Sequence, residues 1–167
     1  MRKILAVLLM LSFCSWANPG YTQDLKVGFI DLKKVMDDYK KVKDGEDQLR
    51  EELQGKDKQR DELVKEIKNL REKLDLLKDE KKEKKQQELD EKVKKLQDFT
   101  YQSRTDLRQN KDEKLREIMK EIKGVIEEYG QSRNYNVIFD RMLLHYADDS
   151  LDVTDDIVKT LNQRYKK

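Results

Sequence analysis

The apolar positions between residues 32 and 77 recur with alternating spacings of three and four residues. Eleven of fourteen positions in this phase are apolar, over more than six heptads. This spacing is typical of the seam along which helices pack in a coiled coil. A disordered segment would not keep such a phase, so the pattern predicts a long helix. Gly45 and Gly55 fall inside it, either as bending points or as ordinary tolerated glycines.

The polar segment 78–88 separates this seam from a second one, which runs from Leu89 to Tyr129 with a stutter between Leu107 and Leu115. The two predicted helical arms have similar lengths, which indicates an antiparallel hairpin that spans residues 32–129 with its tip near 79–88. A single continuous rod is the alternative, because no glycine or proline interrupts the polar segment. We expect the hairpin, because it brings together strands predicted at both ends of the chain. Each arm would reach roughly 60–70 Å at 1.5 Å per residue.

Short strands are predicted on either side of the arms. Residues 25–30 form the first strand, with Asp31 as the N-cap of the following helix. Gly130 is expected to end the second arm, before strands at 135–139 and 142–146. Residues 148–150 are expected to form a turn, and a last helix begins at Thr154. The predicted fold is therefore mainly α with a small β body, made of residues 18–31 and 130–167.

This body is too small for a core that is stable by itself, so oligomerisation is the expected remedy. The residues assigned to its core and to assembly are Val27, Phe29, Val137, Phe139 and Leu143.

The first 17 residues have the form of a secretory signal peptide: a basic head, an apolar run and small residues before a cleavage site after Ala17. Cys14 raises the alternative of a lipoprotein signal, but the bulky Phe13 before it argues against acylation. The mature chain would then have no cysteine, and 35 basic and 35 acidic residues. We therefore expect an exported protein without disulfides and without the basic excess that draws nucleic acid.

No set of residues indicates catalysis or a cofactor. Charged residues make up 43% of the chain, but acidic pairs on solvated helices have no nucleophile or base beside them. The lone His145 lacks partners for a metal site, and Asp148, Asp149 and Asp152 lack the spacing of a calcium loop. We expect structural roles for these residues, with the aspartates in turns and helix caps. Asp140 and Arg141 are expected to form at most a local ion pair.

The residues at the two ends of the chain resemble the Skp/OmpH family of periplasmic chaperones. The resemblance rests on Lys26–Leu32 (KVGFIDL), Tyr135–Arg141 (YNVIFDR) and Leu151–Lys159 (LDVTDDIVK), while the organisation is similar over essentially the whole chain. It implies a homotrimer in the periplasm, with a β body and three helical hairpins around a cavity. Members of the family hold unfolded outer-membrane β-barrel proteins there without ATP.

Apolar residues beside the seam are the candidates for client contact, namely Val64, Leu76, Phe99 and Tyr101. Alternatively, they only widen the apolar face of the helices. A mildly basic tip, with eight basic against six acidic residues in 78–95, could touch an anionic membrane surface. Its lysines are Lys78, Lys81, Lys82, Lys84 and Lys85. Two other functions remain open: a coiled-coil scaffold of the cell envelope, and a surface binder that uses these lysines.

Overall fold

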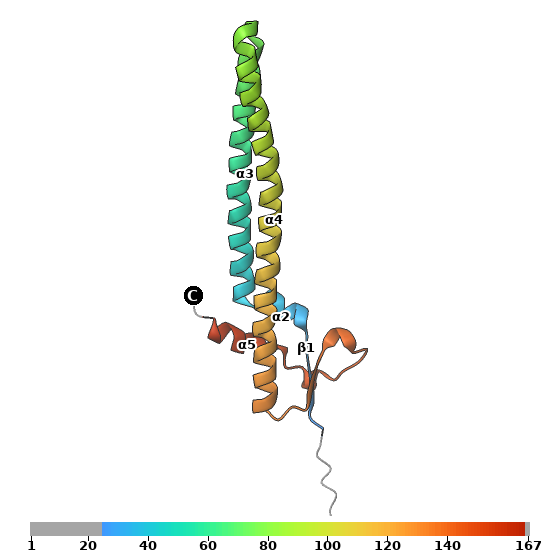
Figure 1. Ribbon diagram of the computed structural model, residues 1–167. Helices are drawn as coiled ribbons and strands as arrows, with labels where there is room; N and C mark the ends of the chain where they lie inside the picture. Colours follow the sequence, from blue (N-terminus) through green and yellow to red (C-terminus); the bar gives the residue numbers. More distant parts are fainter. Residues whose placement is uncertain (1–24, 166–167) are drawn as a thin grey trace, which may run out of the picture.

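Two long helices packed antiparallel form a hairpin that projects from a small body in the computed structural model (Figure 1), which describes residues 25–165. Helix α3 spans Lys40–Asp75 and α4 spans Asp79–Ser132. The predicted hairpin is thus confirmed, and the continuous rod is wrong. The chain reverses at residues 76–78, and residues 79–88 of the polar segment form the first turns of α4.

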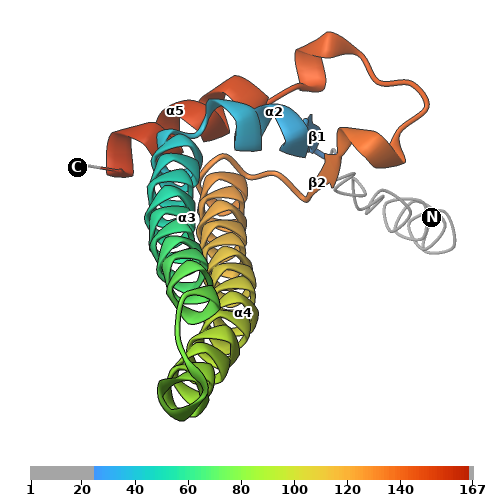
Figure 2. The same cartoon turned by 90° about the horizontal axis from the view of Figure 1, so that it is seen from above.

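The predicted single helix from residue 32 is interrupted at Tyr39, which has an extended backbone with φ −76° and ψ 117°. Helix α2 (Leu32–Asp38) precedes this break and lies beside α5 (Thr154–Arg164) instead of continuing the hairpin (Figure 2). The Asp31 side chain caps α2 by accepting a hydrogen bond from the Lys34 N–H, as predicted. No glycine or proline lies at the break, so its cause is tertiary packing: Tyr39 is buried in the body core.

The body contains a two-stranded parallel sheet. Strand β1 (Val27–Ile30) pairs with β2 (Val137–Asp140), with Val27 opposite Val137. On its other side, β1 forms an isolated bridge from Phe29 to Asp152. The predicted third strand at 142–146 is wrong: residues 141–143 form a short 3-10 helix, and the following loop projects sideways from the body (Figure 2). A second 3-10 helix spans Asp149–Leu151.

Helix α4 was predicted to end at Gly130, but it ends two residues later, at Ser132. Asn134 takes the left-handed conformation, with φ 58°. The N–H of Tyr135 donates to the Gly130 carbonyl at 2.9 Å, and that of Asn134 to the Gln131 carbonyl at 3.3 Å. This pair of bonds is the Schellman motif, in which asparagine can replace glycine because its short polar side chain tolerates the left-handed region.

The apolar interior consists of two separate clusters. The body cluster joins residues of α2, α4 and α5 and includes Val35, Tyr39, Ile122, Ile157 and Leu161. The tip cluster lies between the far ends of α3 and α4; its residues are Ile67, Leu70, Leu74 and Leu89, with Val93 and Leu96 packed against them.

Candidate functional site

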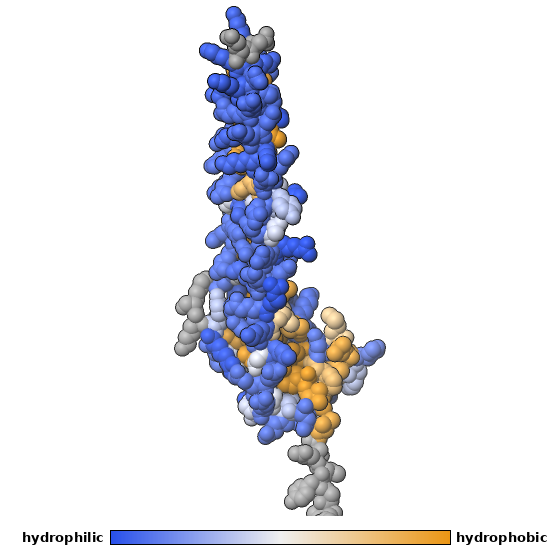
Figure 3. All heavy atoms as spheres, in the orientation of Figure 1, coloured by the Kyte–Doolittle hydropathy of each residue, from blue (hydrophilic) through white to orange (hydrophobic). Residues whose placement is uncertain are grey.

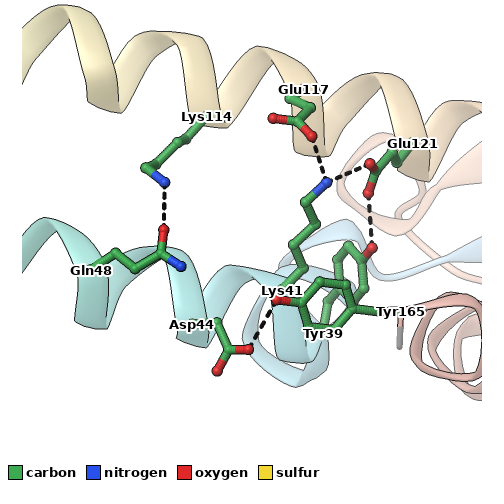
Figure 4. Close-up of polar contacts among 8 residues, drawn as sticks. All are labelled: Tyr39, Lys41, Asp44, Gln48, Lys114, Glu117, Glu121 and Tyr165. Carbon is green, nitrogen blue, oxygen red and sulfur yellow. Dashed lines mark hydrogen bonds and ion pairs between the residues drawn. The ribbon is translucent and has the colours of Figure 1, made fainter. Parts of the chain in front are cut away.

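A polar network joins the two helices where the hairpin meets the body (Figure 4). Lys41 of α3 forms ion pairs with Glu117, at 2.6 Å, and with Glu121 of α4. The Tyr39 hydroxyl donates to the other oxygen of Glu121 at 2.8 Å. Lys41 thus neutralises two carboxylates that face the same side of α3.

The environment of this network shifts the pKa of its members. Burial raises the pKa of Tyr39 to about 12, assisted by its hydrogen bond to Glu121. For Lys41, burial would lower the pKa, but hydrogen bonds and charge attraction from Glu117 and Glu121 outweigh it and raise the pKa. The hydrogen bond from Lys41 holds the pKa of Glu117 below its ordinary value. All three shifts favour the protonation states that keep the helices joined at neutral pH.

Further polar pairs continue along the hairpin between the two apolar clusters. Lys114 donates to Gln48 at 2.8 Å, Asn110 donates to Glu52 at 3.1 Å, and Lys56 lies 3.4 Å from Asp106. The Ser103 hydroxyl is buried nearby without a hydrogen-bond partner among the described residues. The middle of the hairpin is therefore joined mainly by polar contacts, unlike its two ends.

The four residues predicted to contact clients are placed differently. Leu76, in the turn, is 86% exposed, Tyr101 is 74% exposed and Val64 is 46% exposed. Phe99 is half-buried, with the Lys56 Nζ 5.9 Å from its ring centre. Three further apolar residues of the hairpin are exposed but were not predicted to contact clients: Leu53, Leu115 and Met119. Leu53 and Leu115 lie in the two predicted seams, where we expected burial.

The body carries a larger exposed apolar surface than the hairpin (Figure 3). Of the residues assigned to the body, Phe29 is buried, Val27 is half-buried, and Val137, Phe139 and Leu143 are exposed. Four other apolar residues of the body are also exposed but were not assigned to assembly from the sequence, namely Leu25, Met142, Tyr146 and Leu151. Met142 is 88% exposed and Leu143 is 72% exposed, both in the projecting loop. Such contiguous apolar exposure usually marks an interaction site.

A hollow of about 510 Å³ adjoins this surface, where α4 crosses the sheet. Its walls are mostly apolar and include Ile30, Met119, Ile126, Ile138 and Phe139. Strand β2 pairs only with β1, so one edge of β2 carries no strand among the described residues.

Of the tip lysines, Lys78, Lys81, Lys82 and Lys84 are exposed, whereas Lys85 is half-buried and forms an ion pair with Glu88. Side chains extending into solvent at the end of the hairpin are accessible to a charged surface.

The remaining polar candidates have structural roles. The Asp148 carboxylate accepts the Ser150 N–H at 2.9 Å, so its predicted role in a turn is confirmed. The Asp152 carboxylate accepts the Thr154 N–H at 2.8 Å, but Asp152 is not the N-cap of α5, which is Val153. The predicted Asp140–Arg141 pair is not observed. Asp140 caps the short helix by accepting the Met142 N–H, and Arg141 lies over the Phe29 ring.

His145 is exposed, and no group of metal-binding side chains occurs within residues 25–165. In the same range, no helix is long and apolar enough to cross a membrane. The predicted signal peptide and Cys14 lie outside the described residues.

Comparison with known proteins agrees with this architecture. Residues 26–161 match the family described as Outer membrane protein (OmpH-like). The fold is similar to the crystal structure of a proposed outer membrane chaperone (OmpH-like) from Caulobacter crescentus, with a TM-score of 0.78 and 18% identity over 86% of this chain and 87% of that chain. No curated protein sequence matches the chain. The family match covers most of the sequence, and the chain therefore belongs to the OmpH-like outer membrane chaperone family, which is non-enzymatic.

Proposed function

We propose that this protein is a periplasmic holdase that binds unfolded outer-membrane β-barrel proteins between helical arms and prevents their aggregation without ATP. The observation that carries the proposal is the long hairpin, which combines a charged surface with scattered exposed apolar side chains. Such a surface makes weak contacts with many apolar segments while staying soluble. Val64, Leu76, Phe99 and Tyr101 are the proposed client contacts.

We further propose that three copies assemble through the body. A second copy would cover the exposed Phe139 and Leu143, the hollow that Phe139 lines and the open edge of β2. Burying apolar surface contributes about 25 cal/mol per Å² before the cost of association, so a few such residues per copy are enough to matter. The trimer itself is the number that the family resemblance implies.

The decisive experiment dilutes a urea-unfolded outer-membrane β-barrel protein into buffer with the purified chain from Asn18 onwards. We expect suppressed light scattering at about one trimer per client and a soluble complex in sedimentation. Unchanged aggregation with an intact oligomer would favour the envelope scaffold instead.

Photo-crosslinkers at Val64, Leu76, Phe99 and Tyr101 test the contact residues. Crosslinkers at exposed, polar Lys58 and Gln87 serve as matched controls. Client adducts from the first set that exceed those from the controls support the assignment, and equal yields from both sets contradict it.

Assembly through the body is tested by Leu143→Glu, which should shift the sedimenting species to smaller sizes because it places a charge in the proposed interface. Gln131→Glu, on the exposed end of α4, adds the same charge outside that surface and should leave the size unchanged. A Leu143→Glu protein that sediments like the parent would contradict the proposed interface.

The tip lysines are proposed to add a weak attraction to anionic membranes. Flotation with anionic vesicles should show binding that disappears in moderate salt, because exposed charges are screened within about 8 Å at physiological ionic strength. Binding that resists salt, or none at all, would contradict this role.

A further inference from the structure

The break between α2 and α3 is held by a side chain from another helix. A helix that ends leaves carbonyls without partners, and one that begins leaves N–H groups without partners. At this break, the Asn162 Oδ1 accepts the Lys40 N–H at 2.9 Å. The Asn162 Nδ2 donates to the Asp38 carbonyl at 3.1 Å. One carboxamide therefore caps the end of α2 and the start of α3 together.

Tyr165, which directly follows α5, also contacts the region of the break. The Tyr165 ring meets the Tyr39 ring edge-on, with centroids 6.0 Å apart and planes at 79°. Its hydroxyl donates to the Asp44 carboxylate at 2.9 Å, one turn into α3 (Figure 4). Tyr39 is in turn bonded to Glu121 of α4. The end of α5 thus contacts both sides of the break.

Helix α5 is itself fixed in the body. Ile157 and Leu161 are fully buried in the body cluster, together with Val35 of α2. Helix α4 runs from the hairpin into the same cluster through Ile118, Ile122 and Val125. Of α3, only the partly buried Val42 packs against this cluster, so the end of α3 near the body depends mainly on the contacts with α5 and on the polar network with α4.

We propose that Asn162 and Tyr165 are positioning residues that fix the angle between the hairpin and the body. When these contacts hold the end of α3 near the body, α3 supports α4 along the hairpin and limits bending where α4 leaves the body. Without these contacts, α4 is the main rigid connection, because Val42 is the single α3 residue packed against the body cluster. A small apolar hollow of about 130 Å³, lined by residues that include Gly45, Leu49 and Leu115, leaves room for α3 to shift there. This proposal does not depend on what the arms hold.

The test measures distances across the break by double electron–electron resonance. Spin labels are attached at Lys33→Cys on α2 and Lys58→Cys on α3, both exposed, in the chain from Asn18 onwards, which has no cysteine of its own. Labelled chains are mixed with excess unlabelled chain so that each assembly carries one labelled copy.

We expect Asn162→Ala and Tyr165→Phe to broaden or shift the distance distribution, with Asn162→Ala having the larger effect because it removes two hydrogen bonds. The matched controls are Gln163→Ala, next to Asn162 and exposed, and Tyr101→Phe, an exposed tyrosine of the hairpin. Both should keep the parent distribution.

Helix content and the denaturant midpoint are measured in parallel. Variants that lose stability but keep the parent distribution would overturn the proposal, because Asn162 and Tyr165 would then only stabilise α5. If Asn162→Ala fails to fold, Tyr165→Phe decides alone, since it keeps the ring contact with Tyr39 and removes only the hydroxyl.

Discussion

The Tyr135 ring lies directly against the backbone of Gly28, so that a Cβ at residue 28 would come within 2.9 Å of the Tyr135 Cε1. The same ring stacks on Tyr129, with centroids 5.8 Å apart, and carries the Lys26 Nζ 4.2 Å from its centre. Strand β1, the end of α4 and the short segment between α4 and β2 are packed together at this point. A side chain at residue 28 would force the Tyr135 ring to shift from this packed position, so the site favours glycine.

Gly28→Ala should therefore destabilise the protein by about 1–3 kcal/mol, the usual cost of overpacking a closely packed site. Chemical denaturation at fixed chain concentration measures the change. Gly124→Ala is the matched control, because Gly124 lies in α4 and an alanine Cβ there would meet nothing within 4 Å. It should stabilise by about 0.5–1 kcal/mol, the helix preference for alanine over glycine. Equal effects of the two substitutions would contradict the close contact with Tyr135.

The left-handed conformation of Asn134 gives a second prediction. Asn134→Val should cost about 1–2 kcal/mol, because a β-branched side chain clashes with the backbone there. Asn134→Gly should be neutral or slightly stabilising, since glycine adopts this conformation freely. Denaturant midpoints of the two variants check the pair. A valine variant as stable as the glycine variant would show that α4 does not end in this motif.

The Lys41–Glu117 pair predicts a pH dependence. The pKa of Glu117 is lower in the folded protein than its ordinary value of 4.5. Its contribution to stability is therefore fully present above pH 4.5 and is lost as the pH falls through the lowered pKa. The difference in unfolding free energy between the parent and Glu117→Gln should follow this course. Glu62→Gln, an exposed α3 residue outside the ion pairs described, should show no comparable loss. A difference that grows on acidification would contradict the assignment.

The separation of the two apolar clusters predicts that damage at the tip stays local. Leu70→Ala should cost about 2 kcal/mol, at the low end for buried leucines, because the cluster holds only two helices together. Hydrogen exchange should accelerate in residues 63–96 and stay unchanged around Ile122 and Ile157. Ile157→Ala is the reciprocal variant, which should loosen the body and leave the tip protected. Uniform acceleration along the whole hairpin by Leu70→Ala would contradict this independence.

The sequence predicted the elements whose signal is local and periodic. The heptads around Ile67 and Leu70 predicted helix and burial, and both are observed. Strand β2 and the start of α5 were also predicted, since β-branched residues and an acidic first turn identify them. The hairpin followed from the near-equal lengths of the two seams.

Features set by tertiary contacts were not predictable. No residue near Tyr39 in the sequence breaks a helix, and the side chain that caps both helices at the break, Asn162, lies more than 120 positions away. Residues Met142–Tyr146 have strand-like composition but form no pair within the described chain, so composition alone was misleading. The exposure of the apolar residues beside the seam was not predictable either, because Phe99 and Tyr101 differ only in the direction they take on α4.

The parallel pairing of β1 with β2 also predicts an order of folding. Val27 and Val137 pair in the sheet although they are far apart in the sequence. Closing the long loop between them costs conformational entropy before the strand contacts can form. The hairpin closes instead from a three-residue turn and brings the two strands together as its helices join. We therefore expect the body to fold after the hairpin, and a chain whose helices have not joined would expose β1 and β2 as unpaired strands, which are prone to aggregation.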